Sequence, residues 1–146
     1  MEEIWKKSIE ELMKLIADNN SDAMYEISFR FYNGNGVEKD YERSFEYMLK
    51  AAELGNVEAQ FWVGYKYFHE EGTQYNDKDM IMWLNKAAEE NNDMAQWLLG
   101  IIYLEGKENG VDTEQNIDLG MQLLKKSAKS GNEYAIKKLN QLKNDK

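Results

Sequence analysis

One ten-residue stretch recurs three times along the chain, and it constrains the fold more than any other feature of the sequence. Residues 50–59 read KAAELGNVEA, residues 86–95 read KAAEENNDMA, and residues 126–135 read KSAKSGNEYA. The copies lie 36 and then 40 residues apart. Repeats of this length are typical of stacked helical hairpins. In each copy one helix ends at a Gly-Asn-like stop, and the next helix opens with a small alanine.

The residues between these joints predict about eight helices and an all-α protein. Apolar residues spaced three and four apart predict a helix over residues 2–18, which makes residues 1–20 an N-terminal cap. Three helix pairs follow in residues 21–56, 57–92 and 93–132, with Ser21 as the expected N-cap of the first pair. A C-terminal capping helix in residues 133–146 copies only the first half of a repeat. The length of 146 residues favours a single domain, residues 1–146.

The repeated positions form a longer motif, in which a helix with Ala, Leu-Gly and Tyr leads to a glycine turn and then to Lys-Ala-Ala. The third copy carries Ala95, Leu99, Gly100, Tyr103, Gly106, Gly110 and Val111. The second copy carries Ala59, Val63, Gly64, Tyr67, Gly72, Trp83, Lys86, Ala87 and Ala88. The first copy carries Ala23, Ile27, Phe31, Gly34, Gly36, Val37, Asp40, Lys50, Ala51, Ala52 and Gly55. Ser28, Thr73 and Asn91 depart from the pattern. Over about residues 20–140 the chain resembles the Sel-one-like repeat family, relatives of the tetratricopeptide repeats. The resemblance implies a right-handed α–α superhelix, a solenoid of antiparallel helix pairs, which binds proteins and has no chemistry of its own.

Small and aliphatic residues of the motif are expected to build the core. Alanines 23, 59, 95 and 135 and glycines 64 and 100 lie where helices are expected to cross closely. Ile27, Val63, Leu99 and Leu139 are expected to fill the helix-pair interfaces, and Phe31, Tyr67 and Tyr103 to close them.

Composition excludes several classes of function. The net charge of −9 argues against direct binding to nucleic acid, which requires a basic face. The chain has no cysteine and one histidine, so we expect no metal site and no cofactor. It carries no long apolar segment and no signal-peptide pattern, so we expect no membrane partner and a cytoplasmic location. The charge is uneven, because residues 117–146 carry +4 and the remaining residues therefore carry −13.

A second row of side chains is the candidate protein-binding surface. On the first helix of each pair these residues follow i, i+4, i+7 spacing, beside the core positions. They are Tyr25, Phe29 and Tyr32 in the first repeat, Phe61, Tyr65 and Phe68 in the second, and Trp97, Ile101 and Leu104 in the third. The resemblance implies that these positions line a concave surface. Aromatic residues are common anchors in protein interfaces, and His69 is expected at the rim.

Several alternatives stay open at this point. Part of the row, especially Phe61, Trp97 and Ile101, is expected to be buried if neighbouring helices touch there, and self-association is a further use, although we expect a monomer. The main interpretation is a non-enzymatic scaffold or adapter that holds a peptide, helix or basic domain. The alternative is an acidic immunity-type protein that neutralises a basic toxin or nuclease. An enzyme is the third option, but no nucleophile has a visible base partner, and Glu70-Glu71 and Glu89-Glu90 are expected to be solvated surface.

Overall fold

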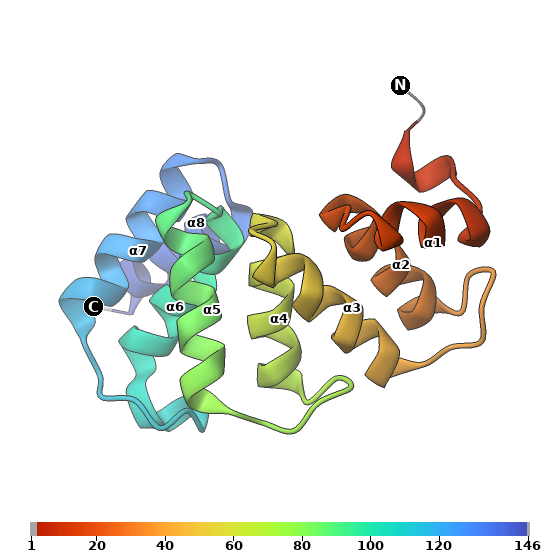
Figure 1. The fold of residues 1–146 in the computed structure, drawn as a ribbon. Coiled ribbons are helices and arrows are strands. Elements are labelled where there is room, and N and C mark those ends of the chain that lie inside the picture. Colours follow the sequence, from red (N-terminus) through yellow and green to blue (C-terminus); the bar gives the residue numbers. More distant parts are fainter. Residues whose placement is uncertain (1–2, 146) are drawn as a thin grey trace. The chain divides into compact units, whose positions relative to one another are not determined.

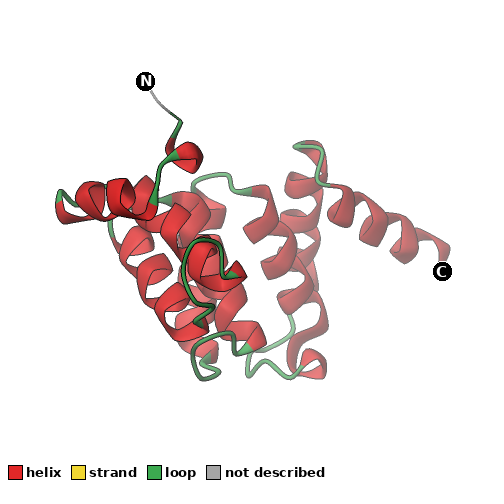
Figure 2. Ribbon diagram, turned by 90° about the vertical axis from the view of Figure 1, so that its right-hand side faces the viewer, coloured by secondary structure: helices red, strands yellow, loops and turns green. Residues whose placement is uncertain are grey.

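The computed structural model describes residues 3–145, apart from the side chains of residues 108 and 109, and the described part is all helical (Figure 1). It contains eight α-helices and two 3-10 turns, with no strand among the described residues (Figure 2). The helices are α1 (Ile9–Ala17), α2 (Ser21–Asn33), α3 (Tyr41–Glu53), α4 (Val57–His69), α5 (Asp77–Glu89), α6 (Asp93–Glu105), α7 (Ile117–Lys129) and α8 (Glu133–Asn144). The 3-10 turns are η1 (Ile4–Lys6) and η2 (Gly106–Asn109). The all-α prediction is confirmed.

The chain divides into two compact units, Met1–Asn76 and Asp77–Lys146, here called the N-terminal and C-terminal units. In the N-terminal unit α1 packs on α2, α2 on α3 and α3 on α4. In the C-terminal unit α5 packs on α6, α6 on α7 and α7 on α8. The division falls between α4 and α5, inside the predicted repeat at residues 57–92. None of the described helices has the length and apolar character needed to cross a bilayer.

The N-terminal helix begins later than the sequence pattern predicts. Residues 1 and 2 lie outside the described residues, and η1 is separated from α1 by Lys7 and Ser8. Ser8 caps α1, since its hydroxyl accepts from the Glu11 N–H while the Glu11 side chain accepts from the Ser8 N–H. Leu12 of α1 is fully buried with Ala23 and Ile27 of α2. This packing closes the core of the N-terminal unit.

The joints between helices follow one design that appears four times. At each joint a residue with positive φ is followed by an asparagine whose backbone N–H bonds back to the ending helix. The asparagine side chain then accepts from the N–H three residues on, so it also caps the next helix. The capping pairs are Asn20 with Ala23, Asn56 with Ala59, Asn92 with Ala95, and Asn132 with Ala135, at 2.8–2.9 Å. Ser21 is therefore not the cap of α2 as predicted, because it already lies inside the helix.

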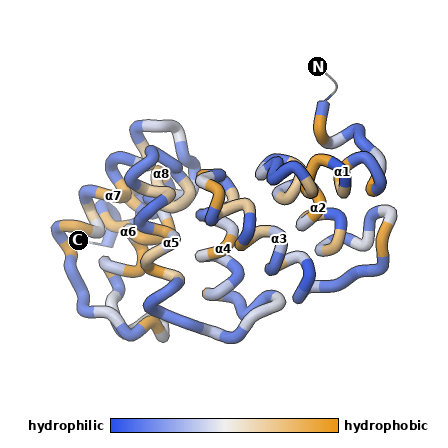
Figure 3. Tube along the Cα trace, in the orientation of Figure 1, coloured by the Kyte–Doolittle hydropathy of each residue, from blue (hydrophilic) through white to orange (hydrophobic). Residues whose placement is uncertain are grey.

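The alanines that follow these caps, Ala23, Ala59, Ala95 and Ala135, are all fully buried, as predicted. So are Ile27, Val63 and Leu99, whereas Leu139 of α8 is only half-buried. Hydrophobic and hydrophilic residues alternate along the helices, and the connection between α4 and α5 is mostly hydrophilic (Figure 3). The core therefore follows the repeated positions of the motif.

Two glycines set the closest helix contact in the C-terminal unit. A methyl group on Gly120 of α7 would lie 2.9 Å from the carbonyl oxygen of Gly100 and 2.9 Å from the backbone nitrogen of Leu104. A methyl group on Gly100 would lie 2.9 Å from Leu124. Side chains larger than hydrogen are therefore excluded from the crossing of α6 and α7. In the N-terminal unit the corresponding positions of α2 and α3 hold Ser28 and Ser44.

Replacing the asparagine cap of α2 should lower the stability of the N-terminal unit. Asn20→Ala removes the acceptor for the Ala23 N–H, and we expect it to lower the free energy of unfolding by about 1 kcal/mol. Asn20→Asp keeps an acceptor at the same position and should retain most of the stability. Urea unfolding followed by circular dichroism measures both variants, and equal losses in both would contradict the capping role.

Gly120→Ala should destabilise the C-terminal unit, because the added methyl meets backbone atoms that have no room to move. Overpacking of this kind costs about 1–3 kcal/mol, so we expect a clear fall in melting temperature. Lys126→Ala on the exposed side of the same helix is the control and should change stability by less than about 0.5 kcal/mol. An unchanged melting temperature for Gly120→Ala would show that α6 and α7 can move apart without a loss of stability.

Candidate functional site

The N-terminal unit contains a continuous cluster of aromatic rings on α2 and α4. Tyr25 and Phe29 of α2 meet edge to face at 5.0 Å, and Phe29 meets Trp62 of α4 edge to face at 5.6 Å. Trp62 contacts Tyr65 at 5.3 Å, and Tyr65 lies 4.2 Å from the ring of His69. Contacts of this geometry stabilise aromatic pairs beyond their burial. The rings therefore form one ordered surface.

Part of this cluster surrounds a pocket of about 300 Å³. The pocket is lined by four aromatic residues and three polar ones: Phe29, Tyr32, Asn33, Trp62, Tyr65, Lys66 and Glu71. The four rings are only partly buried, so part of each ring is exposed to solvent. A small apolar cavity with a few placed polar groups is the usual form of a binding site. We call this site the aromatic pocket.

Lys66 lies at the base of the aromatic pocket and is only 2% exposed. Its ammonium group lies 4.4 Å from the centre of the Tyr32 ring and 3.9 Å from Oε2 of Glu71. It also donates a hydrogen bond of 3.3 Å to the hydroxyl of Ser44. The charge is thus held by a ring face, a carboxylate and a hydroxyl, which together offset part of the cost of burial.

A pair of serines completes the support beneath Lys66. The Ser28 hydroxyl donates to the carbonyl oxygen of Ser44 at 2.6 Å, and the two hydroxyl oxygens lie 3.1 Å apart. Because the Ser28 proton is used for the carbonyl, the Ser44 hydroxyl donates to Ser28. Ser44 is therefore left with acceptor capacity for the ammonium of Lys66. This network explains why Ser28 stands where the family pattern has glycine.

The environment of the pocket shifts the pKa values of two of its residues. Burial lowers the pKa of Lys66, and the nearby Glu71 carboxylate opposes this effect. Burial, the Glu71 charge and the hydrogen bond to Glu71 all raise the pKa of Tyr32. The Tyr32 hydroxyl donates to Oε1 of Glu71 at 3.1 Å. Tyr32 therefore stays protonated at neutral pH and holds the carboxylate in place.

The loop after α4 carries Glu71 into the pocket. Glu70 ends α4 in a left-handed conformation with φ of 54°, and Gly72 has φ of 78°. A methyl group on Gly72 would collide with the carbonyl group of Tyr41 at the start of α3. Glycine is therefore required for the loop to lie against α3. The prediction that Glu71 is solvated surface is wrong, because this loop turns its carboxylate toward Lys66 and Tyr32.

The structure brings together several of the residues that the sequence singles out in the N-terminal unit. Phe29, Tyr32 and Tyr65 line the aromatic pocket, and Tyr25 borders it through Phe29. Phe68 is half-buried against the exposed His69, with ring centres 4.9 Å apart. Phe61 differs, because it is only 2% exposed and its ring is not available to a partner. That the remaining predicted residues of this unit contact a partner protein stays a prediction.

The sequence pattern did not identify four of the pocket residues, Asn33, Trp62, Lys66 and Glu71. One residue along a helix turns the side chain by about 100°, so Trp62 takes the pocket side when Phe61 is buried. The spacing of Trp62, Tyr65 and His69 is i, i+3, i+7, which is also a helical face. That spacing was the available signal for Trp62. Burial of Lys66 depends on partners from α3 and the loop, which no local pattern shows.

The predicted residues of the third repeat lie in the C-terminal unit and are described separately. Trp97 is half-buried, and its ring lies 5.0 Å from that of Tyr134 on α8. Ile101 and Leu104 are also half-buried. The Leu104 carbonyl accepts from the Gln115 side chain at 2.8 Å. Trp97 is thus partly engaged within its own unit.

The aromatic pocket is suited to recognition. Three of its polar groups are paired with one another, because Glu71 accepts from the Tyr32 hydroxyl and lies 3.9 Å from the Lys66 ammonium. Among the side chains that the structure describes, His, Asp and Glu do not gather in a group of three that could hold a metal ion. Rings around a buried cation and a carboxylate can bind a side chain that is partly apolar and partly polar.

Comparison with family models gives three matches, which cover most of the chain. A model described as Sel1 repeat matches residues 21–56, 57–92 and 93–132. The chain belongs to the Sel1 repeat family. Sel1 repeat proteins generally mediate protein–protein interactions, and the fold is typically a non-catalytic scaffold. A comparison with curated proteins gave no significant match.

Solved structures confirm the predicted α-solenoid fold of a Sel1 repeat protein. A Sel1 repeat protein from Oxalobacter formigenes is 27% identical with a TM-score of 0.80, over 91% of this chain and 97% of that one. A protective antigen with an SLR fold from uropathogenic Escherichia coli strains is 26% identical with a TM-score of 0.82. This match covers 89% of the present chain but only 27% of the antigen, so the chain spans about a quarter of that relative. Helicobacter pylori cysteine rich protein B has the same fold at 19% identity and a TM-score of 0.63, over 90% of this chain and 92% of that one.

The buried Lys66 should give the Sel1 repeat protein a measurable pH dependence. Burial penalises the charged lysine only in the folded state, so near its lowered pKa the unfolded chain binds more protons. Stability should therefore rise with pH through that pKa toward the ordinary lysine value, and Lys66→Met should remove this rise. Chemical unfolding from about pH 7 to about pH 9.5, below the ordinary pKa of tyrosine, tests the difference.

Lys126→Met is the matched control, because that lysine is exposed on α7 and its removal should leave the pH dependence of stability unchanged. If the stability difference between the wild-type protein and Lys66→Met does not change with pH, Lys66 is not penalised by burial as described.

Proposed function

We propose that this Sel1 repeat protein is a non-enzymatic binding module that holds a peptide or helix of a partner protein, with the aromatic pocket as its principal anchor site. The observation that carries the proposal is the open 300 Å³ pocket between four half-buried rings. Monomeric proteins rarely leave such apolar groups uncovered without a use. His69, the residue predicted at the rim, is exposed and extends the surface past Tyr65.

The chemistry of the pocket favours a guest side chain with an apolar body and a polar end. The rings of Phe29, Trp62 and Tyr65 offer contact area with few torsions to restrict. Lys66 and Glu71 lie at the polar side and already neutralise one another. Tyrosine, tryptophan, methionine and arginine side chains of a partner combine these properties. A strongly charged guest is not required.

The pocket proposal predicts that one ring controls affinity. Peptides selected for binding to the wild-type protein from a random 12-residue library provide the probe. We expect Tyr65→Ala to weaken their binding at least about 30-fold, the loss typical of a central interface residue. Fluorescence polarisation with labelled peptides measures the affinity, and circular dichroism checks that the helices remain.

Trp5→Ala is the matched control, because Trp5 is 59% exposed in η1 and does not line the pocket. It removes an exposed ring of similar size and should leave the affinity unchanged. If the two variants lose affinity equally, or if neither loses affinity while both stay folded, the aromatic pocket is not the anchor site.

A second candidate is an acidic immunity-type protein located in the cytoplasm, which neutralises a basic toxin or nuclease. The net charge of −9 favours it, because such a field steers basic partners. The salt dependence of partner binding distinguishes the two proposals. Charge-led binding weakens sharply between about 50 and 500 mM salt, whereas binding led by the pocket changes little.

A further inference from the structure

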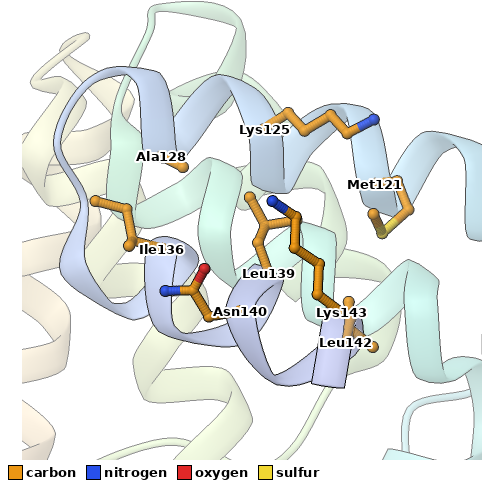
Figure 4. A pocket seen from close by; sticks show the side chains of 8 residues that line it. All are labelled: Met121, Lys125, Ala128, Ile136, Leu139, Asn140, Leu142 and Lys143. Carbon is orange, nitrogen blue, oxygen red and sulfur yellow. The ribbon is translucent and has the colours of Figure 1, made fainter. Parts of the chain in front are cut away.

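A second groove lies in the C-terminal unit, between α7 and α8, and has a volume of about 420 Å³ (Figure 4). Its apolar lining comes from both helices and consists of Met121, Ala128, Ile136, Leu139 and Leu142. Ile136 is 41% exposed, which is unusual for an isoleucine on a packed helix. Lys125, Asn140 and Lys143 complete the lining. We call this site the terminal groove.

The repeat explains why this face of α8 is apolar. Counted from the asparagine caps Asn92 and Asn132, α8 matches α6 position by position. Leu139 and Leu142 correspond to Leu99 and Ile102, and Asn140 corresponds to Gly100. In α6, Leu99 and Ile102 are fully buried, and Gly100 faces Leu124 of the partner helix α7. The same face of α8 is therefore built to receive a helix.

Among the described residues no helix takes that place on α8. Contacts of α8 with another helix are made mainly to α7, whereas α6 is packed on both α5 and α7. Leu139 and Leu142 consequently remain half-exposed. In a helical repeat a face that packs on a neighbouring helix is apolar, whereas a face without a neighbour is normally polar. Here the lining keeps the character of an inner surface.

Charge identifies the kind of helix that fits. Lys125 and Lys143 stand at the groove, and within the described part of the chain neither has a carboxylate partner. Residues 117–146 carry seven lysines and three acidic residues. A second copy docking through the same face would bring these lysines together and be repelled. An acidic surface on the guest would be attracted.

We propose that the terminal groove binds an acidic amphipathic helix of a partner protein, which packs on α8 as α7 packs on α6. The apolar side of the guest covers Ile136, Leu139 and Leu142, and its acidic flanks meet Lys125 and Lys143. Asn140 replaces the close-contact glycine, so the guest pairs a small polar residue with this amide, as Ser44 pairs with Ser28. This site is separate from the aromatic pocket and does not depend on the function proposed for it.

The chain supplies a probe of the correct shape. A capped peptide of residues 40–53 contains α3 with its Asp40 cap, and the charged residues of this helix lie on its exposed side. Arg43→Glu with Lys50→Glu makes the peptide acidic, while Glu42→Lys, Glu46→Lys and Glu53→Lys make a basic counterpart with the same apolar side. We expect the acidic peptide to bind the full-length protein at least tenfold more tightly than the basic peptide at about 50 mM salt, with the difference falling as salt rises.

Variants of the protein locate the binding and test its charge preference. Ile136→Glu should reduce binding of the acidic peptide at least tenfold, and this half-exposed position tolerates the change without unfolding. The double variant Lys125→Glu with Lys143→Glu should reverse the preference, so that the basic peptide binds more tightly. Trp5→Ala changes an exposed residue that lines neither the terminal groove nor the aromatic pocket, so it should leave binding of both peptides unchanged. Thermal melting confirms that each variant is folded.

Three results would overturn the proposal: no binding of the acidic peptide, equal binding of both peptides, or binding that survives Ile136→Glu. Sedimentation equilibrium tests the other occupant. If the wild-type protein forms a dimer that Ile136→Glu dissociates, the groove holds a second copy instead of an acidic helix.

Discussion

The asparagine joint is the interaction on which the rest of the structure depends. One residue ends a helix through its backbone N–H and begins the next through its side-chain oxygen, so the chain reverses within two residues. The reversal places a fully buried alanine at the start of every following first helix, from Ala23 to Ala135. Asn19 and Asn91 adopt positive φ where the other joints have glycine, which shows that the geometry matters more than the residue type. The direction of each helix, the pairing of the helices and the core positions all follow from the asparagine joint.

Local structure, including that of the proposed aromatic pocket, differs where equivalent positions of the repeat hold different residues. Position 30 holds an arginine that bonds to the carbonyl oxygens of Trp5 and Lys7 and so fixes the N-terminal segment. Position 66 holds the buried lysine of the aromatic pocket, and position 102 holds a fully buried isoleucine. The crossing of each helix pair varies similarly, with a serine pair between α2 and α3 and a glycine pair between α6 and α7. The helical scaffold is constant, and single residue differences within it produce these local structures.

The sequence predicts the fold well because the joints are local. Each joint is formed by a few consecutive residues, and the distance between successive joints along the sequence sets the helix lengths. The aromatic pocket is predicted only in part, because contacts between distant parts of the chain place some of its residues. Periodicity identifies Phe29, Tyr32 and Tyr65 as members of one face, but it cannot decide between Phe61 and Trp62, because both lie beside the core row and tertiary packing buries the first. Glu71 lies in a loop whose path depends on Gly72 fitting against α3, which is a long-range contact.

Lys66 is the residue whose presence is hardest to explain by stability alone. A hydrophobic residue in place of a buried charge is often neutral or stabilising, and the same position in the third repeat holds isoleucine. The chain instead surrounds the lysine with Tyr32, Ser44 and Glu71, which come from α2, α3 and the loop after α4. These partners fix the floor of the pocket and turn the Tyr32 ring and the Glu71 carboxylate toward it. Exceptions to the rules of packing are usually found at functional sites. In the N-terminal unit the exception is the buried Lys66, which lines the aromatic pocket beside the partly exposed rings.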